Sequence, residues 1–404
     1  MTGPGNHAQQ GRIVALAAGG TGGHMFPAQA LARELLSRGS RVALVTDRRG
    51  SGFGADLPEV ETERINAGAL AGGSLLKKLS SVGRLAVGYL QARGVLRRLG
   101  ADTVVGFGGY ASVPTVLAGA HRGLRVVLHE QNAVLGRANR LLAPRAHAIA
   151  ASFAEVKGLN DEDRHKVAFT GNPVRPAIAA LGEDPYPRPG PEATLRLLVI
   201  GGSQGAEVFN TMVPAAVEAL PEALRRRLAI SQQVRGQATD KVRGVYDAAG
   251  VTANLAGFFE DMPERLRGAQ LVIGRAGAST IAELAAAGRP AVLVPYPYAA
   301  DDHQTANARA FAATGGGWVL PQAELTAGDL SELLARVLAD PAVLQDAAAA
   351  AYGFGRAGAA GRLADLVCGG GSHQDDPASG PASGPASGPA SGPAQGPTKR
   401  ETAA

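Results

Sequence analysis

The chain has 404 residues, of which 45% are hydrophobic, 4% aromatic and 19% charged, and its formal net charge is +5 at pH 7. This length exceeds one ordinary core and predicts two domains of about 150 to 200 residues each. The moderate hydrophobic content argues against a multi-span membrane protein. The single cysteine, Cys368, excludes an internal disulfide and a multi-cysteine zinc site.

Charge and cysteine usage also indicate the environment of the chain. The positive charge favours acidic partners such as phosphates, nucleic acid or an anionic membrane face, without choosing among them. The low cysteine content fits a reducing compartment and predicts a cytoplasmic location. Residues 1–12 lack a basic region joined to a long apolar region, so no signal peptide is expected.

In chain order, short apolar runs alternate with helical stretches from Arg12 to about Ala151. The runs are IVALAA (13–18), RVALVTD (41–47), DTVVGF (102–107), LRVVLHE (124–130) and HAIAAS (147–152). This alternation predicts βαβ units in a parallel sheet. The uncharged run 103–120 could mimic a membrane span, but its glycines and Pro114 predict a strand, a glycine loop and a helix.

Residues 75–100, LLKKLSSVGRLAVGYLQARGVLRRLG, form an amphipathic basic segment. Its apolar residues include Leu75, Leu76, Leu79, Val82 and Leu85, and its basic residues are Lys77, Lys78, Arg84, Arg93, Arg97 and Arg98. We expect the Leu75 end to be a peripheral membrane patch. The alternative, an ordinary helix packed on a core, is expected for the C-terminal half.

A second series of apolar runs begins at LRLLVIGG (195–202) and continues through RLAISQQV (227–234), QLVIGR (270–275) and PAVLVPY (290–296). A helical pattern follows from Thr326 to about Val367, and then PASG repeats that cannot build a core. The sequence therefore predicts a first domain over 11–180, a proline-rich linker over 181–194, a second domain over 195–368 and a disordered tail over 369–404. Both domains are expected to be α/β and Rossmann-like.

Three glycine loops follow predicted strands: GGTGGH (19–24), GFGGY (106–110) and GGSQGA (201–206). Glycine lets a backbone approach a phosphate closely at a helix N-terminus, although each loop could also be a simple tight turn. No P-loop motif occurs in them. The stretch Gly106–Ala111 satisfies G-x-G-x-x-G/A and Asp47 ends another strand, so a dinucleotide-dependent oxidoreductase stays open.

Seven motifs occur in the order and approximate spacing of the MurG family of N-acetylglucosaminyltransferases. They are GGTGGHMFPAQALA (19–32), GFGGYASVP (106–114), LHEQN (128–132), GNPVR (171–175), GGSQGA (201–206), FFEDM (258–262) and AGAST-IAEL (276–284). The chain resembles this family over roughly residues 11–367. The resemblance implies a GT-B fold, in which two Rossmann-like parallel-sheet domains flank a cleft and the second domain binds most of the sugar donor.

The resemblance also implies a donor site for UDP-N-acetylglucosamine. Ser203 and Arg175 would meet the phosphates, Glu283 the ribose hydroxyls and the backbone of Phe259 the uracil edge. Gln304, with His303 beside it, and Asn132 would contact the sugar, and Ala278 belongs to the same donor-binding set. Two positions depart from some family members, which have Ser at Ala276 and a Gln pair at His303-Gln304.

Thr21, Gly22 and Gly23 would line the acceptor side, beside His24. We expect His24 to be the catalytic base, because an imidazole titrates near neutral pH. Its alternative role is to bind a phosphate or cap the loop, and Glu130 is the rival base. HEQN lacks the second histidine of a zinc motif, and Asp161-Glu162-Asp163 is expected to be a solvated turn, so no metal and no cofactor are predicted.

The implied reaction moves N-acetylglucosamine from UDP to the C4 hydroxyl of the muramyl sugar of lipid I, with inversion, giving lipid II. The implied partners are UDP-N-acetylglucosamine, undecaprenyl-linked lipid I, the anionic cytoplasmic membrane face and other cell-wall synthesis proteins, but not nucleic acid. The enzyme would be peripheral on that face. The alternatives are a UDP-sugar epimerase of similar shape, the oxidoreductase, and a non-catalytic nucleotide-sugar-binding protein.

Overall fold

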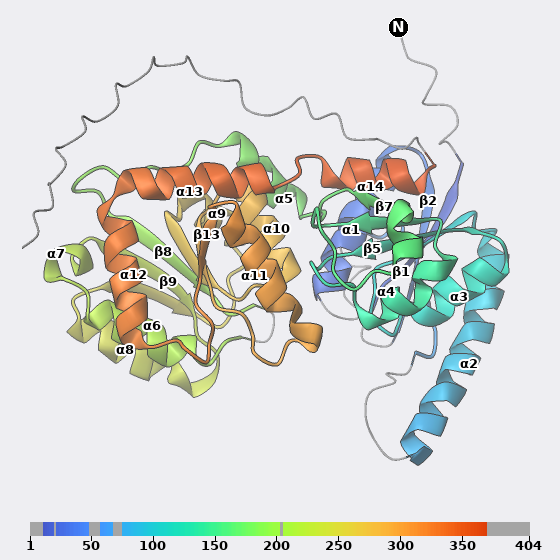
Figure 1. The fold of residues 1–404 in the computed structure, drawn as a ribbon, viewed down its shortest axis with the longest axis horizontal. Coiled ribbons are helices and arrows are strands. Elements are labelled where there is room, and N and C mark those ends of the chain that lie inside the picture. Colours follow the sequence, from blue (N-terminus) through green and yellow to red (C-terminus); the bar gives the residue numbers. More distant parts are fainter. Residues whose placement is uncertain (1–10, 20–21, 48–56, 68–74, 203–204, 370–404) are drawn as a thin grey trace, which may run out of the picture. The chain divides into compact units, whose positions relative to one another are not determined.

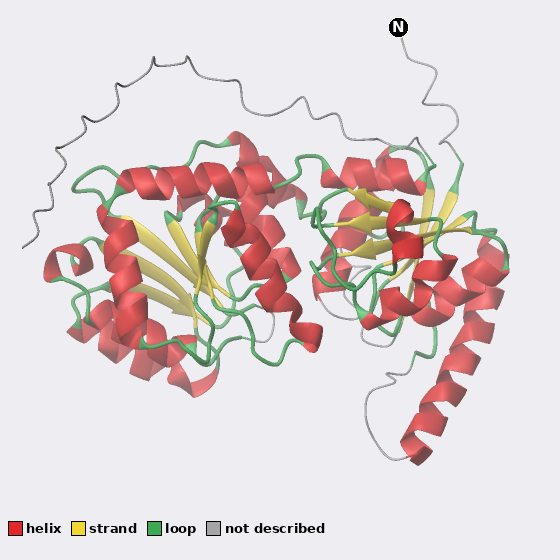
Figure 2. Cartoon of the chain, viewed as in Figure 1, coloured by secondary structure: helices red, strands yellow, loops and turns green. Residues whose placement is uncertain are grey.

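The computed structural model describes residues 11–19, 22–47, 57–67, 75–202 and 205–369, with backbone only at 22 and 75–82. They form two parallel β-sheets, each covered by helices on both faces (Figures 1 and 2). The α/β prediction is therefore confirmed, and the calls on the tail after residue 369 lie outside the described residues.

The first sheet has seven parallel strands in the order β3-β2-β1-β4-β5-β6-β7. The strands are β1 (Ile13–Ala17), β2 (Arg41–Thr46), β3 (Glu61–Arg64), β4 (Thr103–Gly106), β5 (Arg125–Glu130), β6 (Ala148–Ala151) and β7 (Val167–Phe169). The helices of this part are α1 (Gly22–Ser37), α2 (Leu75–Leu99), α3 (Val113–His121) and α4 (Arg137–Leu142), whereas α5 (Pro176–Ala179) packs on α10 (Ala278–Ala287) of the second sheet. The run 103–120 is thus a strand, a glycine loop and a helix, as predicted.

The second sheet has six parallel strands in the order β10-β9-β8-β11-β12-β13. The strands are β8 (Leu195–Ile200), β9 (Leu228–Gln233), β10 (Thr252–Ala256), β11 (Leu271–Gly274), β12 (Ala291–Leu293) and β13 (Gly317–Val319). Its helices are α6 (Phe209–Glu218), α7 (Glu222–Arg225), α8 (Thr239–Ala248), α9 (Met262–Gly268), α10 (Ala278–Ala287), α11 (His303–Ala313), α12 (Ala327–Ala339) and α13 (Pro341–Phe354). The last helix, α14 (Ala359–Val367), packs on α1 and β6 of the first sheet.

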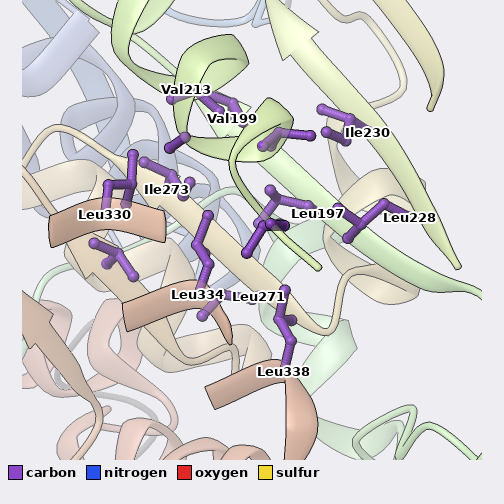
Figure 3. Packing of buried hydrophobic residues seen from close by; sticks show 14 of the residues in the cluster. Leu197, Val199, Val213, Leu228, Ile230, Leu271, Ile273, Leu330, Leu334 and Leu338 are labelled. Carbon is purple, nitrogen blue, oxygen red and sulfur yellow. The ribbon is translucent and has the colours of Figure 1, made fainter. Parts of the chain in front are cut away.

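Alternation of side chains along each central strand explains why both faces of the sheets are covered. In β1, Val14 and Leu16 join one core cluster, whereas Ala15 and Ala17 join the cluster on the opposite face. Figure 3 shows the equivalent packing under the second sheet, where Leu197 and Val199 of β8 meet Leu334 of α12. Such strands need apolar residues on both faces, which is why they read as continuous apolar runs.

The two sheets share one doubly wound order, and each reverses direction between its first and fourth strands in sequence. In the first sheet this switch point lies between β1 and β4, and in the second between β8 and β11. Loops that leave the carboxyl ends of these strands diverge there and leave room for a ligand. The predicted glycine loops 19–24, 106–110 and 201–206 leave three of these four strands.

The basic segment 75–100 forms one helix, α2. Ala92, Val95 and Leu96 are buried in the first core, so the C-terminal half packs as predicted. Val87 and Leu90 are 47% and 66% exposed. The side chains of residues 75–82 lie outside the described residues. Among the described helices, none combines the length and the apolar composition needed to cross a bilayer.

Candidate active site

The GFGGY loop, which follows β4, lies against the imidazole of His24 near the start of α1. Gly108 and Gly109 both have left-handed backbones, with φ of 83° and 70°. A Cβ on Gly108 would lie 3.5 Å from His24 Nε2, and one on Gly109 would lie 3.4 Å from His24 Cε1. Glycine is therefore required for the GFGGY loop to take its turn against this ring. The switch point of the first sheet thus holds an imidazole.

The surroundings of His24 keep its ring neutral. Burial, and secondly the neighbouring His303 side chain, lower the pKa of His24 to about 4. His129 lies buried at the end of β5, and burial lowers the pKa of His129 to about 3. The Gln131 amide donates 3.0 Å to His129 Nδ1, which fixes the proton of that ring on Nε2. At neutral pH both rings therefore carry no charge.

Glu130, the rival base, is enclosed by donors. Its Oε1 accepts from the backbone N of Asn132 at 3.0 Å, and its Oε2 accepts from the backbone N of Gly136 at 2.9 Å and from Asn139 Nδ2 at 2.8 Å. Burial raises the pKa of this carboxyl group, and these hydrogen bonds oppose the rise. Such a carboxylate shapes the loop from Asn132 to Gly136.

Asn307 of α11 joins that loop to the second domain, and no motif had marked it, since it simply lies one turn after His303. Its Oδ1 accepts from the backbone N of Ala133 at 2.8 Å. Its Nδ2 donates to Asn132 Oδ1 at 3.0 Å and to the Ala276 carbonyl at 3.1 Å. Asn307 is fully buried, and these bonds use the donors and acceptor that its amide offers. The predicted sugar contact Asn132 is therefore held by an amide from the opposite side.

Arg175 and Glu283, which the sequence assigns to phosphate and ribose, pair with each other. Arg175 Nη2 lies 2.9 Å and Nε 3.1 Å from Glu283 Oε1. The Arg175 guanidinium also lies over the Phe26 ring, 5.2 Å from its centroid, two residues beyond His24. Burial raises the pKa of Glu283, and Arg175 opposes the rise. Arg175 therefore contacts both α10, through the ion pair, and α1, through the Phe26 ring.

Other predicted donor residues lie at the edge of the second sheet. The Phe259 ring is buried beneath the Arg265 guanidinium, 3.8 Å from its centroid, so only its backbone is available to a ligand. Gln304 Oε1 accepts from the backbone N of Tyr296 at 3.0 Å. His303 Nδ1 donates to the Ala300 carbonyl at 2.6 Å, which leaves Nε2 as the acceptor. Ala278 is the first residue of α10.

The predicted residues Thr21, Gly22, Gly23 and Ser203 lie in or beside the segments that the structure does not describe. Thr21 and Ser203 lie outside the described residues, and Gly22 is described only as the first residue of α1. Gly23 is exposed, and a Cβ there would meet nothing within 4 Å. The acceptor-side assignments at these positions thus rest on the sequence.

The Asp161–Asp163 stretch differs from the expected solvated turn. It opens a 3-10 helix in which Asp163 is buried and accepts from Lys166 Nζ at 2.7 Å, whereas Asp161 stays exposed and pairs with Arg164. The lysine pairing allows the Asp163 carboxylate to be buried. Across the residues that the structure describes, no three His, Cys, Asp or Glu side chains gather as a metal site would require.

A pocket of about 340 Å³ lies beside this site, on another face of α10. Its walls include Asn172, Ile281, Ala285, Tyr352 and Gly355. Glu283 lies roughly 130° around the helix from the centre of the lining face, at 100° per residue. The pocket reaches the predicted donor residues only at Ala278, so it is not the predicted donor site.

Comparison with known proteins assigns both halves of the chain to one family. Residues 14–151 match the N-terminal domain of glycosyltransferase family 28, and residues 196–363 match its C-terminal domain. A transferase of Rhodospirillum centenum named UDP-N-acetylglucosamine--N-acetylmuramyl-(pentapeptide) pyrophosphoryl-undecaprenol N-acetylglucosamine transferase is 58% identical over 356 residues, covering 88% of this chain and 94% of the relative.

Solved structures give the same result at the level of the fold. The crystal structure of MurG from Acinetobacter baumannii superposes with a TM-score of 0.73 at 29% identity, covering 88% of this chain and 99% of that one. A UDP-N-acetylglucosamine 2-epimerase superposes with a TM-score of 0.62 at 13% identity, covering 88% and 95%, and that likeness concerns the fold alone. Together with the two parallel sheets, these neighbours confirm the predicted GT-B fold.

Proposed function

The chain belongs to the MurG family of glycosyltransferases, and from that premise we propose that it transfers N-acetylglucosamine from UDP-N-acetylglucosamine to the C4 hydroxyl of the muramyl sugar of lipid I. The products are lipid II and UDP. Similarity over 88% of the chain to a relative that bears this activity in its name supports the assignment. The epimerase alternative has only a fold likeness at 13% identity behind it.

The observation that supports the chemistry is the neutral His24 ring at the switch point of the first sheet. We assign His24 the role of base: one nitrogen of its neutral ring takes the proton from the C4 hydroxyl as that oxygen bonds to the anomeric carbon. The bond from the anomeric carbon to the UDP oxygen breaks, and UDP leaves with the electron pair. A base must be unprotonated before the reaction, and a pKa of about 4 meets that condition.

Negative charge that develops on the leaving diphosphate needs fixed positive groups. Arg175 is the described cation among the predicted phosphate contacts, and Ser203 is assigned beside it. In this proposal the donor replaces the Arg175–Glu283 ion pair: the diphosphate takes the guanidinium, and the ribose hydroxyls donate to the Glu283 carboxylate. Both groups then keep a partner when the donor binds, so neither charge is buried alone.

Glu130 has a positioning role in this proposal. Its carboxylate already accepts four hydrogen bonds, the fourth from Asn132 Nδ2 at 3.3 Å, and all of them hold the loop that presents Asn132. Taking a substrate proton would remove charge from these bonds.

We also propose that the enzyme works at the anionic cytoplasmic face of the membrane, because lipid I is anchored there. Helix α2 supports this proposal, because it exposes the apolar side chains of Val87 and Leu90 together with basic residues such as Arg93. Apolar side chains would enter the headgroup region, and each basic residue would add about 1 kcal/mol near an anionic surface.

A flotation assay tests this surface. Leu90→Asp should reduce binding to vesicles that contain anionic lipid by about tenfold, since it removes an apolar contact with the membrane and adds a negative charge that the anionic lipids repel. The matched control is Val343→Asp, at a 37% exposed valine of α13, which should bind as the wild type does. Equal binding by Leu90→Asp, or binding that does not weaken with salt, contradicts the proposed surface.

The reaction itself is tested by incubating the protein with UDP-N-acetylglucosamine and a soluble lipid I analogue. Release of UDP only when the acceptor is present, with a disaccharide product of inverted linkage, supports the transfer. Release of UDP without acceptor, together with an epimerised sugar, would instead support the epimerase. An absorbance change of added nicotinamide cofactor would support the oxidoreductase.

A further inference from the structure

Arg137 and Asp301 form a bidentate ion pair next to the proposed site. Arg137 is the first residue of α4, which follows the loop held by Glu130, and Asp301 lies just before α11. Arg137 Nη2 donates to Asp301 Oδ1 at 2.9 Å, and Nε donates to Oδ2 at 3.2 Å. A planar guanidinium that bonds both oxygens of a carboxylate fixes direction as well as distance.

The turn that carries Asp301 has an unusual backbone. Asp301 and Asp302 have φ of 52° and 51°, and among the described residues they are the two non-glycine residues with positive φ. Aspartate tolerates this region better than most residues, but two in succession are costly and need support from their surroundings. The Asp302 side chain accepts from Thr305 Oγ1 at 2.6 Å, and Asp301 has Arg137. Residues His303 and Gln304 follow this turn directly.

Arg137 also reaches the loop that encloses His24. The Asp301 carboxylate, and secondarily the Tyr110 side chain, raise the pKa of Arg137. Tyr110 directly follows Gly108 and Gly109, which lie against the imidazole. The guanidinium is therefore bonded to the turn that starts α11, and it also interacts electrostatically with Tyr110 of the GFGGY loop.

From this geometry we propose that Arg137 is a positioning residue for sugar transfer: through Asp301 it holds the start of α11 so that His303 and Gln304 face the donor sugar opposite His24. The inference rests on the proposed function, because it assigns the sugar to His303 and Gln304. No sequence motif marked Arg137, since a lone arginine after a glycine looks like an ordinary helix-start residue.

Exposure separates this role from one in overall stability. The Arg137 side chain is 64% exposed and that of Asp301 29%. Ion pairs this exposed contribute little to the unfolding free energy. A strained turn beside such a pair is better explained by the need to place the two residues that follow it.

The test compares donor binding with binding of UDP, which lacks the sugar. Arg137→Gln should raise KM for UDP-N-acetylglucosamine about fivefold, while the inhibition constant of UDP and the Tm stay at the wild-type values. Asp301→Asn keeps a residue that accepts a left-handed backbone but loses the negative charge. Its KM for UDP-N-acetylglucosamine should therefore be raised as much as that of Arg137→Gln. The double variant should be no worse than either single variant, because both act through one contact.

Arg137→Lys keeps the positive charge but cannot bond both carboxylate oxygens in the same way. Its KM for UDP-N-acetylglucosamine should therefore fall between those of the wild type and Arg137→Gln. The matched control is Arg164→Gln, which removes another exposed arginine from an ion pair, with Asp161 at 2.7 Å, and should leave KM unchanged. An unchanged KM in Arg137→Gln overturns the proposal, as does an equal loss of UDP binding or a lowered Tm. If the wild type itself transfers no sugar, the proposed function fails instead, and the two failures are thereby told apart.

Discussion

The two sheets of the molecule share one strand order but carry different groups at the equivalent edge. The first places the His24 imidazole between the loops after β1 and β4, with a pKa lowered to about 4. The second places Arg275 after β11, where the buried guanidinium donates to the Val294 and Pro295 carbonyls and to Gln322. One edge thus holds a neutral proton acceptor and the other a fixed cation.

This difference shows how one architecture is divided between two chemical tasks. A switch point supplies diverging loops and helix N-termini whatever the sequence, and the side chains then set the charge. Burial lowers the pKa of His24 and of His129 and keeps both rings neutral, and a neutral His24 suits proton transfer. The Arg275 guanidinium, by contrast, is held in place by the carbonyl oxygens that accept its hydrogen bonds.

The largest effect is expected on the first sheet. His24→Ala should lower kcat by about 10² to 10⁴, the range that general base catalysis supplies, with little change in KM for UDP-N-acetylglucosamine. Because the His24 pKa is about 4 in the free enzyme, kcat/KM should show no loss from protonation of this ring between pH 8 and pH 5. Steady-state rates across that pH range, with both substrates varied, provide the measurement.

His24→Gln serves as the control, since it keeps a polar side chain of similar reach that cannot take up a proton. It should be as slow as His24→Ala. If His24 only binds phosphate, the glutamine variant should instead recover activity. Near-wild-type turnover in His24→Ala would sink the assignment of the base.

A second prediction concerns acid stability and also separates the two sheets. His129 has a pKa near 3 when folded and near 6.5 when unfolded, so below pH 6.5 the unfolded chain binds the proton first. The stabilisation is complete above pH 6.5 and declines by about 1.4 kcal/mol per pH unit as the pH falls towards 3. Denaturant titrations at pH 7, 6, 5 and 4 measure it, and probes in the first domain should report the loss before probes in the second.

His165→Asn is the matched control for that experiment, because His165 is exposed and its replacement should leave the slope unchanged. His129→Asn should reduce the slope by about 1.4 kcal/mol per pH unit, since one of the two buried neutral histidines is gone while His24 still contributes. A wild-type stability that stays constant from pH 6.5 to pH 4 is incompatible with a buried neutral His129.

The sequence predicted the central strands and missed the outer ones. The nine apolar runs correspond to β1, β2, β4, β5, β6, β8, β9, β11 and β12, whereas β3, β7, β10 and β13 gave no signal. These four are the edge strands of the two sheets. An edge strand is less covered and can be polar, as in Glu61–Arg64, where three of four residues are exposed. Its position depends on a neighbour that a local pattern does not reveal.

In the candidate site, too, some features could be predicted from the sequence and others could not. Loops with special backbone demands were predictable, because Gly108 and Gly109 must be glycine to lie against His24. Contacts that join distant segments were not. Asn307 bonds to Ala133, 174 residues away in sequence, and the burial of Asp163 depends on Lys166. Amides and ion pairs of this kind depend on tertiary packing, which leaves no periodic pattern.

The smallest effect is expected at the Arg175–Glu283 pair. Arg175→Ala should weaken UDP binding about tenfold, through the loss of a charged contact to the diphosphate. The variant also leaves the Glu283 carboxylate buried without its cation, so the pKa of Glu283 should rise further. The free energy of unfolding should fall by about 1 kcal/mol. This loss is modest because the Arg175 side chain is 34% exposed and solvent screens the pair. Adding Glu283→Gln to Arg175→Ala removes the unpaired charge and should restore stability without restoring UDP binding. Calorimetric titration with UDP and denaturant titration of the single and double variants separate the two contributions. Recovery of UDP affinity in the double variant would mean that Arg175 acts only by neutralising Glu283 and that another cation meets the diphosphate.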